Sequence, residues 1–599
     1  MEYSALSSLP EMFFKQSERL GDAPFLWSKR NERWQSMSWR EVREQVDAVR
    51  RGLQSLGIEK GDRVALISEN RPEWLIADIG IMAAGAITVP AYTTNTTDDH
   101  AHILSDSGAK LAIVSTAALS RNVLPAAERT GIARTIVTLE PLHPAPMTGL
   151  TVMGWGKLLD RGRKEADPSD TPGRSVLRTD TACIIYTSGT SGKPKGVMLS
   201  HGAILCNCMG AHEFLKALPD FSRDRESFLS FLPLSHSYEH TAGQFLPIAI
   251  GAELYYAEGV EKLVPNLAEV QPTIMTAVPR LYEAMHARIQ RGVAHANGPQ
   301  RWLFNKTLSL GRKQYEAPET LSSGEKALNF LLDRLVRAKV KKRFGGRLKA
   351  FVSGGAPLNY DIGLFFTALG LRIMQGYGQT EAAPVVSCNR YDINKLRTVG
   401  PPLKGAEVKI AEDGEILVQG ELVMQGYWNN PQATAETIQN GWLHTGDIGV
   451  IDEDGFIQIT DRKKDIIVNS GGDNLSPARV EGMLTAEPEL AQAMVYGDKR
   501  PHLVAVVVPD PEFVKDWARA NDKPQNLSEL VGDTAFNKAL HDVIDRVNDN
   551  LSVIERVRRL IVATEPFTIE NEMMTPTMKL RRHVIVDAYG EALDRLYAH

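Results

Sequence analysis

The sequence predicts an α/β fold with a large N-terminal domain and a small, mobile C-terminal α+β domain, and three observations carry this prediction. Short β-branched runs alternate with helical patterns through the first half of the chain, which is typical of βαβ units and mostly parallel sheets. From Glu407 the pattern changes to short strands and tight turns, which predicts a small β-rich subdomain. The chain has 599 residues, which is too long for one small module.

The predicted strands of the large domain are short apolar runs, at 63–67, 111–114, 135–139, 182–186, 349–352 and 371–374. Helices are predicted over 39–56 and after Pro72, where apolar residues recur at helical spacing. The last three strands each run into a glycine-rich turn. Because ligands bind beyond the carboxyl ends of strands in open α/β sheets, these turns predict a binding site.

The most apolar stretch, 74–92, approaches the length of a membrane span. Asp78, Gly85 and Pro90 interrupt it. We therefore predict a buried helix that turns into a strand.

A charge-rich helical insertion is predicted between Arg280 and Gly345. Its end carries the basic residues Lys339, Lys341, Lys342 and Arg343. A solvated helix face is the expected interpretation, and contact with an anionic ligand or a membrane surface is the alternative.

A polar junction at 461–464, without apolar periodicity, predicts the domain boundary. It divides the chain into an N-terminal domain, 1–461, and a C-terminal domain, 462–599. In the second domain we predict strands near 493–495 and 503–508, followed by helices to the end of the chain.

Composition excludes some classes of protein. A net charge of −5 does not favour a nucleic-acid partner, which usually requires a basic excess. Four scattered cysteines predict reduced thiols and not a disulfide framework. The amino terminus lacks the pattern of a signal peptide. We expect a cytoplasmic protein and leave open a peripheral contact with the inner membrane face. The composition does not indicate an oligomeric state.

The clearest chemical motif is YTSGTSGKPKG at 186–196, directly after a predicted buried strand. Its glycines let successive backbone N–H groups face an anion, its hydroxyls can bind phosphate or Mg²⁺, and its lysines neutralise charge. A Walker loop does not fit, because Thr187 and Pro194 stand where that pattern requires glycine and a hydroxyl residue. The sequence therefore predicts a phosphate-binding loop of another kind.

Two further clusters are SGGAP at 353–357 and QGYGQTE at 375–381. Together they supply a flat aromatic ring, small residues that permit close approach, and the carboxylate of Glu381. A purine would require the first two features, and Mg²⁺ would require the carboxylate.

These motifs, with GWLHTGDIG at 441–449 and DRKKDIIVNSGG at 461–472, resemble the ordered signatures of the adenylate-forming superfamily. That superfamily contains acyl-CoA synthetases, adenylation domains of peptide synthetases, and luciferases. The segments FLPLSHSYEH, AVPRLYE, VSGGAPL and TPTMK most closely resemble the corresponding segments of long-chain fatty-acid CoA ligases. The resemblance covers about residues 10 to 590.

The resemblance implies roles for individual residues. The phosphates of ATP would be bound by Thr187, Ser188, Gly189, Thr190, Ser191, Gly192 and Lys195, and Mg²⁺ by Thr187 and Glu381. The base and its surroundings would involve Gly354, Gly355, Ala356, Pro357, Gln375, Gly376, Tyr377, Gly378 and Thr380, and the ribose would contact Asp447 and Arg462.

Other implied roles lie toward the C-terminus. Lys579 corresponds to the catalytic lysine, although Met578 stands where the commoner pattern has glycine. Lys464 takes the hinge position, Gly471 and Gly472 would face CoA, and His236 would line the acyl pocket unless it is an ordinary structural histidine.

The implied activity is AMP-forming ligation of fatty acids to CoA, with ATP and CoA as co-substrates and Mg²⁺ as cofactor. A fatty acyl-AMP ligase, which would pass its acyl group to a carrier protein, is the alternative. An adenylation domain with a fused carrier is not expected, because the chain ends soon after Lys579. A binding module without activity would not need both Glu381 and Lys579 beside a phosphate loop.

Overall fold

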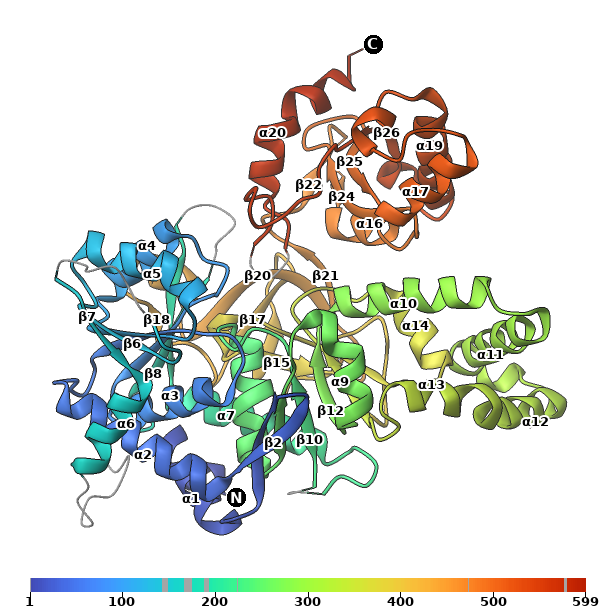
Figure 1. Cartoon of the computed structure of the whole chain (residues 1–599). Helices are drawn as coiled ribbons and strands as arrows, with labels where there is room; N and C mark the ends of the chain where they lie inside the picture. The colour runs from blue at the N-terminus through green and yellow to red at the C-terminus, as the bar shows by residue number, and fades with distance from the viewer. Residues whose placement is uncertain are drawn as a thin grey trace.

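Two eight-stranded sheets form the body of the large domain (Figure 1). The computed structural model describes residues 2–142, 149–165, 175–187, 193–222, 225–471, 473–575 and 579–598. These parallel-rich sheets, together with a smaller C-terminal domain, confirm the predicted fold class.

In the first sheet the central strands run parallel and the edge strands β15 and β2 are antiparallel to their neighbours. Its order is β15 (Val385–Cys388), β14 (Ile373–Gly378), β13 (Ala350–Ser353), β12 (Ile274–Ala277), β10 (Ser227–Ser230), β11 (Glu253–Tyr256), β1 (Pro24–Arg30) and β2 (Arg33–Ser38).

The second sheet is parallel except at its β8–β9–β18 end. Its order is β18 (Gly426–Tyr427), β9 (Lys195–Ser200), β8 (Thr181–Thr187), β4 (Ile87–Pro90), β3 (Arg63–Ile67), β5 (Leu111–Val114), β6 (Thr135–Thr138) and β7 (Thr151–Gly154). Strands β5 and β4 are buried at every position, because helices cover both faces of a parallel sheet.

The large domain contains further helices outside the insertion, and several begin at a side-chain cap; for example, Ser38 and Glu41 form a capping box for α2. They are α1 (Leu9–Leu20), α2 (Trp39–Ser55), α3 (Pro72–Ala83), α4 (Thr97–Ser107), α5 (Ala117–Thr130), α6 (Trp155–Lys164), α7 (His201–Leu215), α8 (Leu246–Ile250), α9 (Leu263–Val270), α14 (Tyr360–Ala368) and α15 (Pro431–Thr437), with a π-helix, η2 (Glu239–Phe245).

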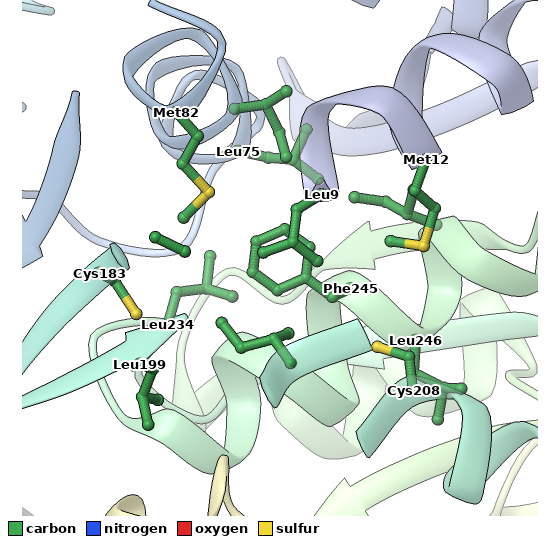
Figure 2. Packing of buried hydrophobic residues seen from close by; sticks show 14 of the residues in the cluster. Leu9, Met12, Leu75, Met82, Cys183, Leu199, Cys208, Leu234, Phe245 and Leu246 are labelled. Atoms are coloured by element: carbon green, nitrogen blue, oxygen red, sulfur yellow. The ribbon is translucent and has the colours of Figure 1, made fainter. Parts of the chain in front are cut away.

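One hydrophobic core joins the two sheets. Figure 2 shows side chains of α1, α3, α7, β8 and β9 converging around Phe245, which is fully buried. Burial of a phenylalanine contributes about 3 kcal/mol. Because residues of both sheets belong to the same cluster, the carboxyl ends of their strands are fixed relative to each other. All four cysteines are free and buried.

The apolar stretch at 74–92 forms the buried helix α3 and the strand β4, as predicted. Asp78 is fully buried within it, and its Oδ2 lies 2.8 Å from His240 Nε2 and 2.8 Å from Gln244 Nε2, both in η2. This polar contact explains why a carboxylate interrupts the stretch. Within the described residues, no helix combines the length and apolarity needed to cross a bilayer.

The predicted insertion forms a helical lobe, residues 279–347, which projects from the side of the large domain (Figure 1). Its helices are α10 (Pro279–Ala294), α11 (Gly298–Glu316), α12 (Ser323–Leu332) and α13 (Ala338–Arg343), with a π-helix, η5 (Asp333–Arg337), between the last two.

The β-rich subdomain is a five-stranded antiparallel sheet. It contains β16 (Glu407–Ile410), β17 (Glu415–Gln419), β19 (Ile438–Gln439), β20 (Trp442–Ile451) and β21 (Ile457–Arg462). In Figure 1, β20 and β21 lie between the large domain and the C-terminal domain.

The C-terminal domain has its own two hydrophobic clusters, and neither contains a described residue before Ile467. It comprises β22 (Ile467–Val468), β23 (Asn474–Leu475), α16 (Pro477–Leu484), β24 (Leu490–Tyr496), β25 (Leu503–Pro509), α17 (Pro511–Ala520), α18 (Leu527–Leu530), α19 (Thr534–Asn548), β26 (Val557–Val562) and α20 (Arg582–Arg595). The prediction of helices alone after β25 was wrong, because β26 pairs with β25 in parallel. The sequence of β26 is VRRLIV, and its two arginines interrupt the apolar run from which a strand would be predicted.

Candidate active site

The phosphate-loop motif spans the connection between β8 and β9. Thr187 is the last residue of β8 and pairs with Lys195, the first residue of β9. Ser188, Gly189, Thr190, Ser191 and Gly192 lie outside the described residues. The strand pair therefore brings the hydroxyl residue Thr187 and the basic residue Lys195 to the same end of the second sheet.

Tyr427 connects this end of the second sheet to the Glu381 turn of the first. Lys195 Nζ lies 4.6 Å from the centre of the Tyr427 ring, and the Tyr427 hydroxyl donates to Glu381 Oε1 at 2.9 Å. Burial and the charge of Glu381 raise the pKa of Tyr427, so the phenol keeps its proton as the donor. The sequence interpretation missed Tyr427, because the dipeptide Gly426-Tyr427 carries no motif and pairs with β9 only in the folded chain.

Two glycines of the second and third clusters lie close against other parts of the protein. A Cβ on Gly354 would lie 3.1 Å from Tyr238 Cζ, whose hydroxyl donates to Val352 O at 2.8 Å. A Cβ on Gly378 would lie 1.9 Å from Pro384 O, where β14 meets β15. These close approaches provide a structural reason for glycine in addition to the predicted room for a purine.

The remaining residues of these clusters divide into exposed and buried groups. Gly355, Ala356 and Pro357 form an exposed turn after β13. Gly376 lies within β14, which continues beyond the predicted strand at 371–374. Thr380 is buried, and its Oγ1 lies 3.0 Å from Ser237 Oγ. Gln375 is also buried, and its Oε1 has no hydrogen-bond partner among the described atoms.

Asp447 is the centre of a hydrogen-bonded group formed by three of the predicted site residues. Its carboxylate is buried and accepts from the Tyr377 hydroxyl at 2.7 Å and from Arg462 Nε at 2.9 Å. Asp447 in β20 and Arg462 in β21 are register partners, so the antiparallel pair brings them together. A carboxylate has about four acceptor positions, and two donors leave it able to accept further hydroxyl groups.

Lys579 of the C-terminal domain lies within electrostatic range of the same residues. Lys579 is exposed; the surrounding protein atoms and the charge of Arg462 lower its pKa, and Asp447 and Glu381 act in the opposite direction. The charge of Lys579 also reaches His236: burial, with a contribution from Lys579, lowers the pKa of that imidazole to about 4. His236 is therefore neutral at pH 7, and its Nδ1 accepts from the backbone N–H of Tyr238 at 3.2 Å.

Contacts with the large domain and with the β-rich subdomain hold the C-terminal domain and the junction in this orientation. Arg280 Nη1 donates to Ala491 O at 3.0 Å, and Asn359 Nδ2 donates to Gly482 O at 3.1 Å. Lys463 Nζ lies 2.6 Å from Asp413 Oδ2 in the β-rich subdomain. Lys464 follows in an exposed turn in which the N–H groups of residues 465 and 466 donate to the carbonyl of residue 462.

The predicted CoA turn lies elsewhere in the C-terminal domain. Asn469 Oδ1 accepts from the N–H groups of Gly471 and Asp473, each at 2.9 Å, which shapes the turn between β22 and β23. Gly472 lies outside the described residues. In this orientation no described hydrogen bond joins the turn to Glu381 or Asp447.

Oxygen donors at Thr187 and Glu381 suit Mg²⁺. Within the described ranges, no group of three or more His, Cys, Asp or Glu residues could hold a metal ion by itself. Mg²⁺ commonly binds through one or two carboxylates together with substrate phosphates and water. The donor set therefore fits a metal that arrives with a nucleotide.

The fold and this site define the class of protein. Residues 13–428 match the AMP-binding enzyme family and residues 464–599 match the AMP-binding enzyme C-terminal domain, and the chain belongs to this family.

Individual relatives extend over nearly the whole chain. The chain is 35% identical over 575 residues to the long-chain-fatty-acid–CoA ligase FadD15 of Mycobacterium tuberculosis, a match that covers 94% of this chain and 92% of that protein. Among solved structures, it resembles the A domain of carboxylic acid reductase from Segniliparus rugosus in complex with AMP and a co-purified carboxylic acid, with a TM-score of 0.77, 22% identity and coverage of 99% and 94%. It also resembles O-succinylbenzoate coenzyme A synthetase of Bacillus subtilis in complex with ATP and magnesium ion, with a TM-score of 0.67, 21% identity and coverage of 96% and 98%.

Proposed function

We propose that this protein is an AMP-forming long-chain fatty-acid CoA ligase, which converts a fatty acid, ATP and CoA into acyl-CoA, AMP and pyrophosphate. The observation that carries the proposal is the position of Lys579, on the C-terminal domain, within electrostatic range of Glu381 and Asp447. The name of the FadD15 relative supports the long-chain acyl group and CoA as substrates.

We assign the domain boundary to the end of β21, between residues 461 and 462, so that residues 1–461 bind ATP and the fatty acid and residues 462–599 move. The phosphates would lie against Thr187, the loop that follows it, and Lys195. Mg²⁺ would be held by Thr187 and Glu381 and would neutralise charge on the phosphates. The ribose would donate to Asp447, which Arg462 and Tyr377 already orient.

The first step joins the fatty acid to AMP. The carboxylate oxygen attacks the α-phosphorus, a new P–O bond forms, and the bond to pyrophosphate breaks. Negative charge builds on the phosphate oxygens in this step, so a positioned cation contributes most of the stabilisation. Lys579 is a compact cation suited to bridging the carboxylate and the α-phosphate.

The second step transfers the acyl group to sulfur. A carboxylate has no leaving group for a thiol to displace, whereas the acyl-adenylate releases AMP when the CoA thiolate attacks its carbonyl carbon. We propose that rotation about Lys464 replaces Lys579 at the site with the turn containing Gly471 and Gly472, where glycine leaves room for the thin pantetheine arm.

Chain-length preference tests the substrate assignment. We expect kcat/KM to rise from acetate to acids of about C12 to C18, because each CH₂ buried in an apolar tunnel contributes about 0.8 kcal/mol, or about fourfold. Initial rates of pyrophosphate release are measured across the acid series with saturating ATP and CoA. A kcat/KM that stays flat or falls with chain length would refute the long-chain assignment.

The same assay without CoA distinguishes the alternative function. A CoA ligase forms thioester and turns over only when CoA is present. A fatty acyl-AMP ligase would release pyrophosphate with the same acids but form no acyl-CoA.

A further inference from the structure

The helical lobe carries the most exposed aromatic side chains of the protein. Trp302 on α11 is 59% exposed and Phe330 on α12 is 66% exposed. All 9 Trp and 18 Phe residues lie in described ranges, and in these ranges Trp302 and Phe330 are the only ones with exposed side chains. A contiguous apolar patch on a surface marks an interaction site, whereas apolar side chains scattered singly are normal.

The exposed apolar side chains of α12 and η5 share one helix face. Phe330, Leu331 and Leu335 are 66%, 50% and 41% exposed, and positions 331 and 335 are one helical turn apart. Another side of this helix packs inward, where Leu332 joins a small core with Leu310 and Leu321. The helix is therefore apolar on two sides, and only one side is covered by the protein.

The lobe is strongly basic in an acidic protein. Residues 279–347 contain 15 Lys and Arg against 5 Asp and Glu, a net charge of +10, whereas the whole chain carries −5. Three of the five acids already pair inside the lobe: Glu283 with Arg280, Glu325 with Lys313, and Asp333 with Arg337. Lys339, Lys341 and Lys342 are exposed and lie in α13, which follows η5 and its exposed Leu335 directly along the chain.

We propose that this face of the lobe docks on an anionic lipid bilayer. Basic residues beside solvent-facing Phe and Leu side chains are typical of helices that lie in a membrane interface, where the ring enters the headgroup region and the lysines meet anionic lipid. Two other partners fit this face less well. A second copy of the chain that docked through the same face would bring two lobes of charge +10 together. A nucleic acid would leave the apolar side chains exposed to water. The proposal depends on the surface alone and not on the proposed reaction.

Vesicle binding tests the proposal in the absence of substrates. The full-length protein is sedimented with phosphatidylcholine vesicles that contain or lack phosphatidylglycerol, at low and at high salt. We expect binding to the anionic vesicles that weakens with salt and little binding to the neutral ones. The triple variant Lys339→Glu, Lys341→Glu, Lys342→Glu should bind about 100-fold more weakly, since each lysine near the surface contributes about fivefold.

A second variant removes the apolar side chains of the lobe. A matched control removes exposed apolar side chains elsewhere, to test whether their position on the lobe matters. Phe330→Ser with Leu331→Ser and Leu335→Ser should lose at least about tenfold in vesicle affinity. Val553→Ser with Ile554→Ser removes similarly exposed side chains from the C-terminal domain and should bind as the unaltered protein does. Thermal unfolding verifies that each variant is folded.

Three results would overturn the proposal: equal binding by the lobe variants and the control, equal binding to neutral and anionic vesicles, or a change of oligomeric state in the lobe variants while vesicle binding persists. If the unaltered protein binds vesicles but has no ligase activity, the result contradicts the proposed function and supports the docking surface.

Discussion

Lys579→Ala is expected to reduce formation of the acyl-adenylate by about 100-fold or more while thioester formation from synthetic acyl-AMP continues. The reason is positional: the charge of Lys579 acts on the same site as Glu381 and Asp447 in the orientation described here. Once the adenylate exists, that cation has completed its role. Pyrophosphate exchange measures the first step, and thioester formation from supplied acyl-AMP measures the second. Lys538→Ala, at an exposed lysine of α19, is the matched control.

Lys464→Pro is expected to show the reverse pattern. Proline fixes φ and removes an N–H, which would obstruct rotation in the exposed turn that follows β21. Adenylate should still form, and thioester should not follow. Lys464→Ala removes the same side chain, keeps backbone freedom, and should support both steps. Parallel losses of the two steps in Lys579→Ala and Lys464→Pro would contradict the division of labour between the two orientations.

Glu381→Gln is expected to reduce adenylate formation by about 100-fold or more, because it removes the carboxylate charge proposed to hold Mg²⁺. The amide oxygen can still accept from Tyr427, so local packing is preserved. Tyr427→Phe is the companion variant: it keeps the charge and loses one hydrogen bond, which contributes about 1.5 kcal/mol, or about tenfold.

A magnesium titration distinguishes loss of a metal ligand from loss of the Tyr427 hydrogen bond as the cause of reduced adenylate formation. If Glu381 holds the metal, the Glu381→Gln variant should require much more Mg²⁺ for half-maximal pyrophosphate exchange, and Tyr427→Phe should require nearly the normal amount. Near-normal activity of Glu381→Gln at low Mg²⁺ would show that Glu381 is not a ligand.

Local patterns predicted much of the large domain. Buried strands such as β3 and β5 read as continuous apolar runs, and α2 has both its cap and its apolar spacing in the sequence. The hairpin β1–β2 and the strand β26 were not predicted. In β26 and β2 charged and polar side chains occupy exposed positions, so strand identity depends on tertiary pairing and not on local composition.

The residue types of the candidate site could be predicted from motifs, but several of their contacts could not. Tyr427 lies far from both Lys195 and Glu381 in the chain, and only the pairing of β18 with β9 places it between them. Gly354 was interpreted as room for a ligand, and the structure shows that it also accommodates Tyr238. Long-range contacts of this kind leave no periodic signal in the sequence.

The most direct test of the proposed function is the balance of products from a single reaction containing a long-chain fatty acid, ATP, Mg²⁺ and CoA. AMP, pyrophosphate and acyl-CoA are quantified together by chromatography. The proposed mechanism predicts that the three appear in equal amounts and that omission of CoA stops sustained turnover. ADP and inorganic phosphate as the nucleotide products, or AMP without any acyl-CoA, would contradict it.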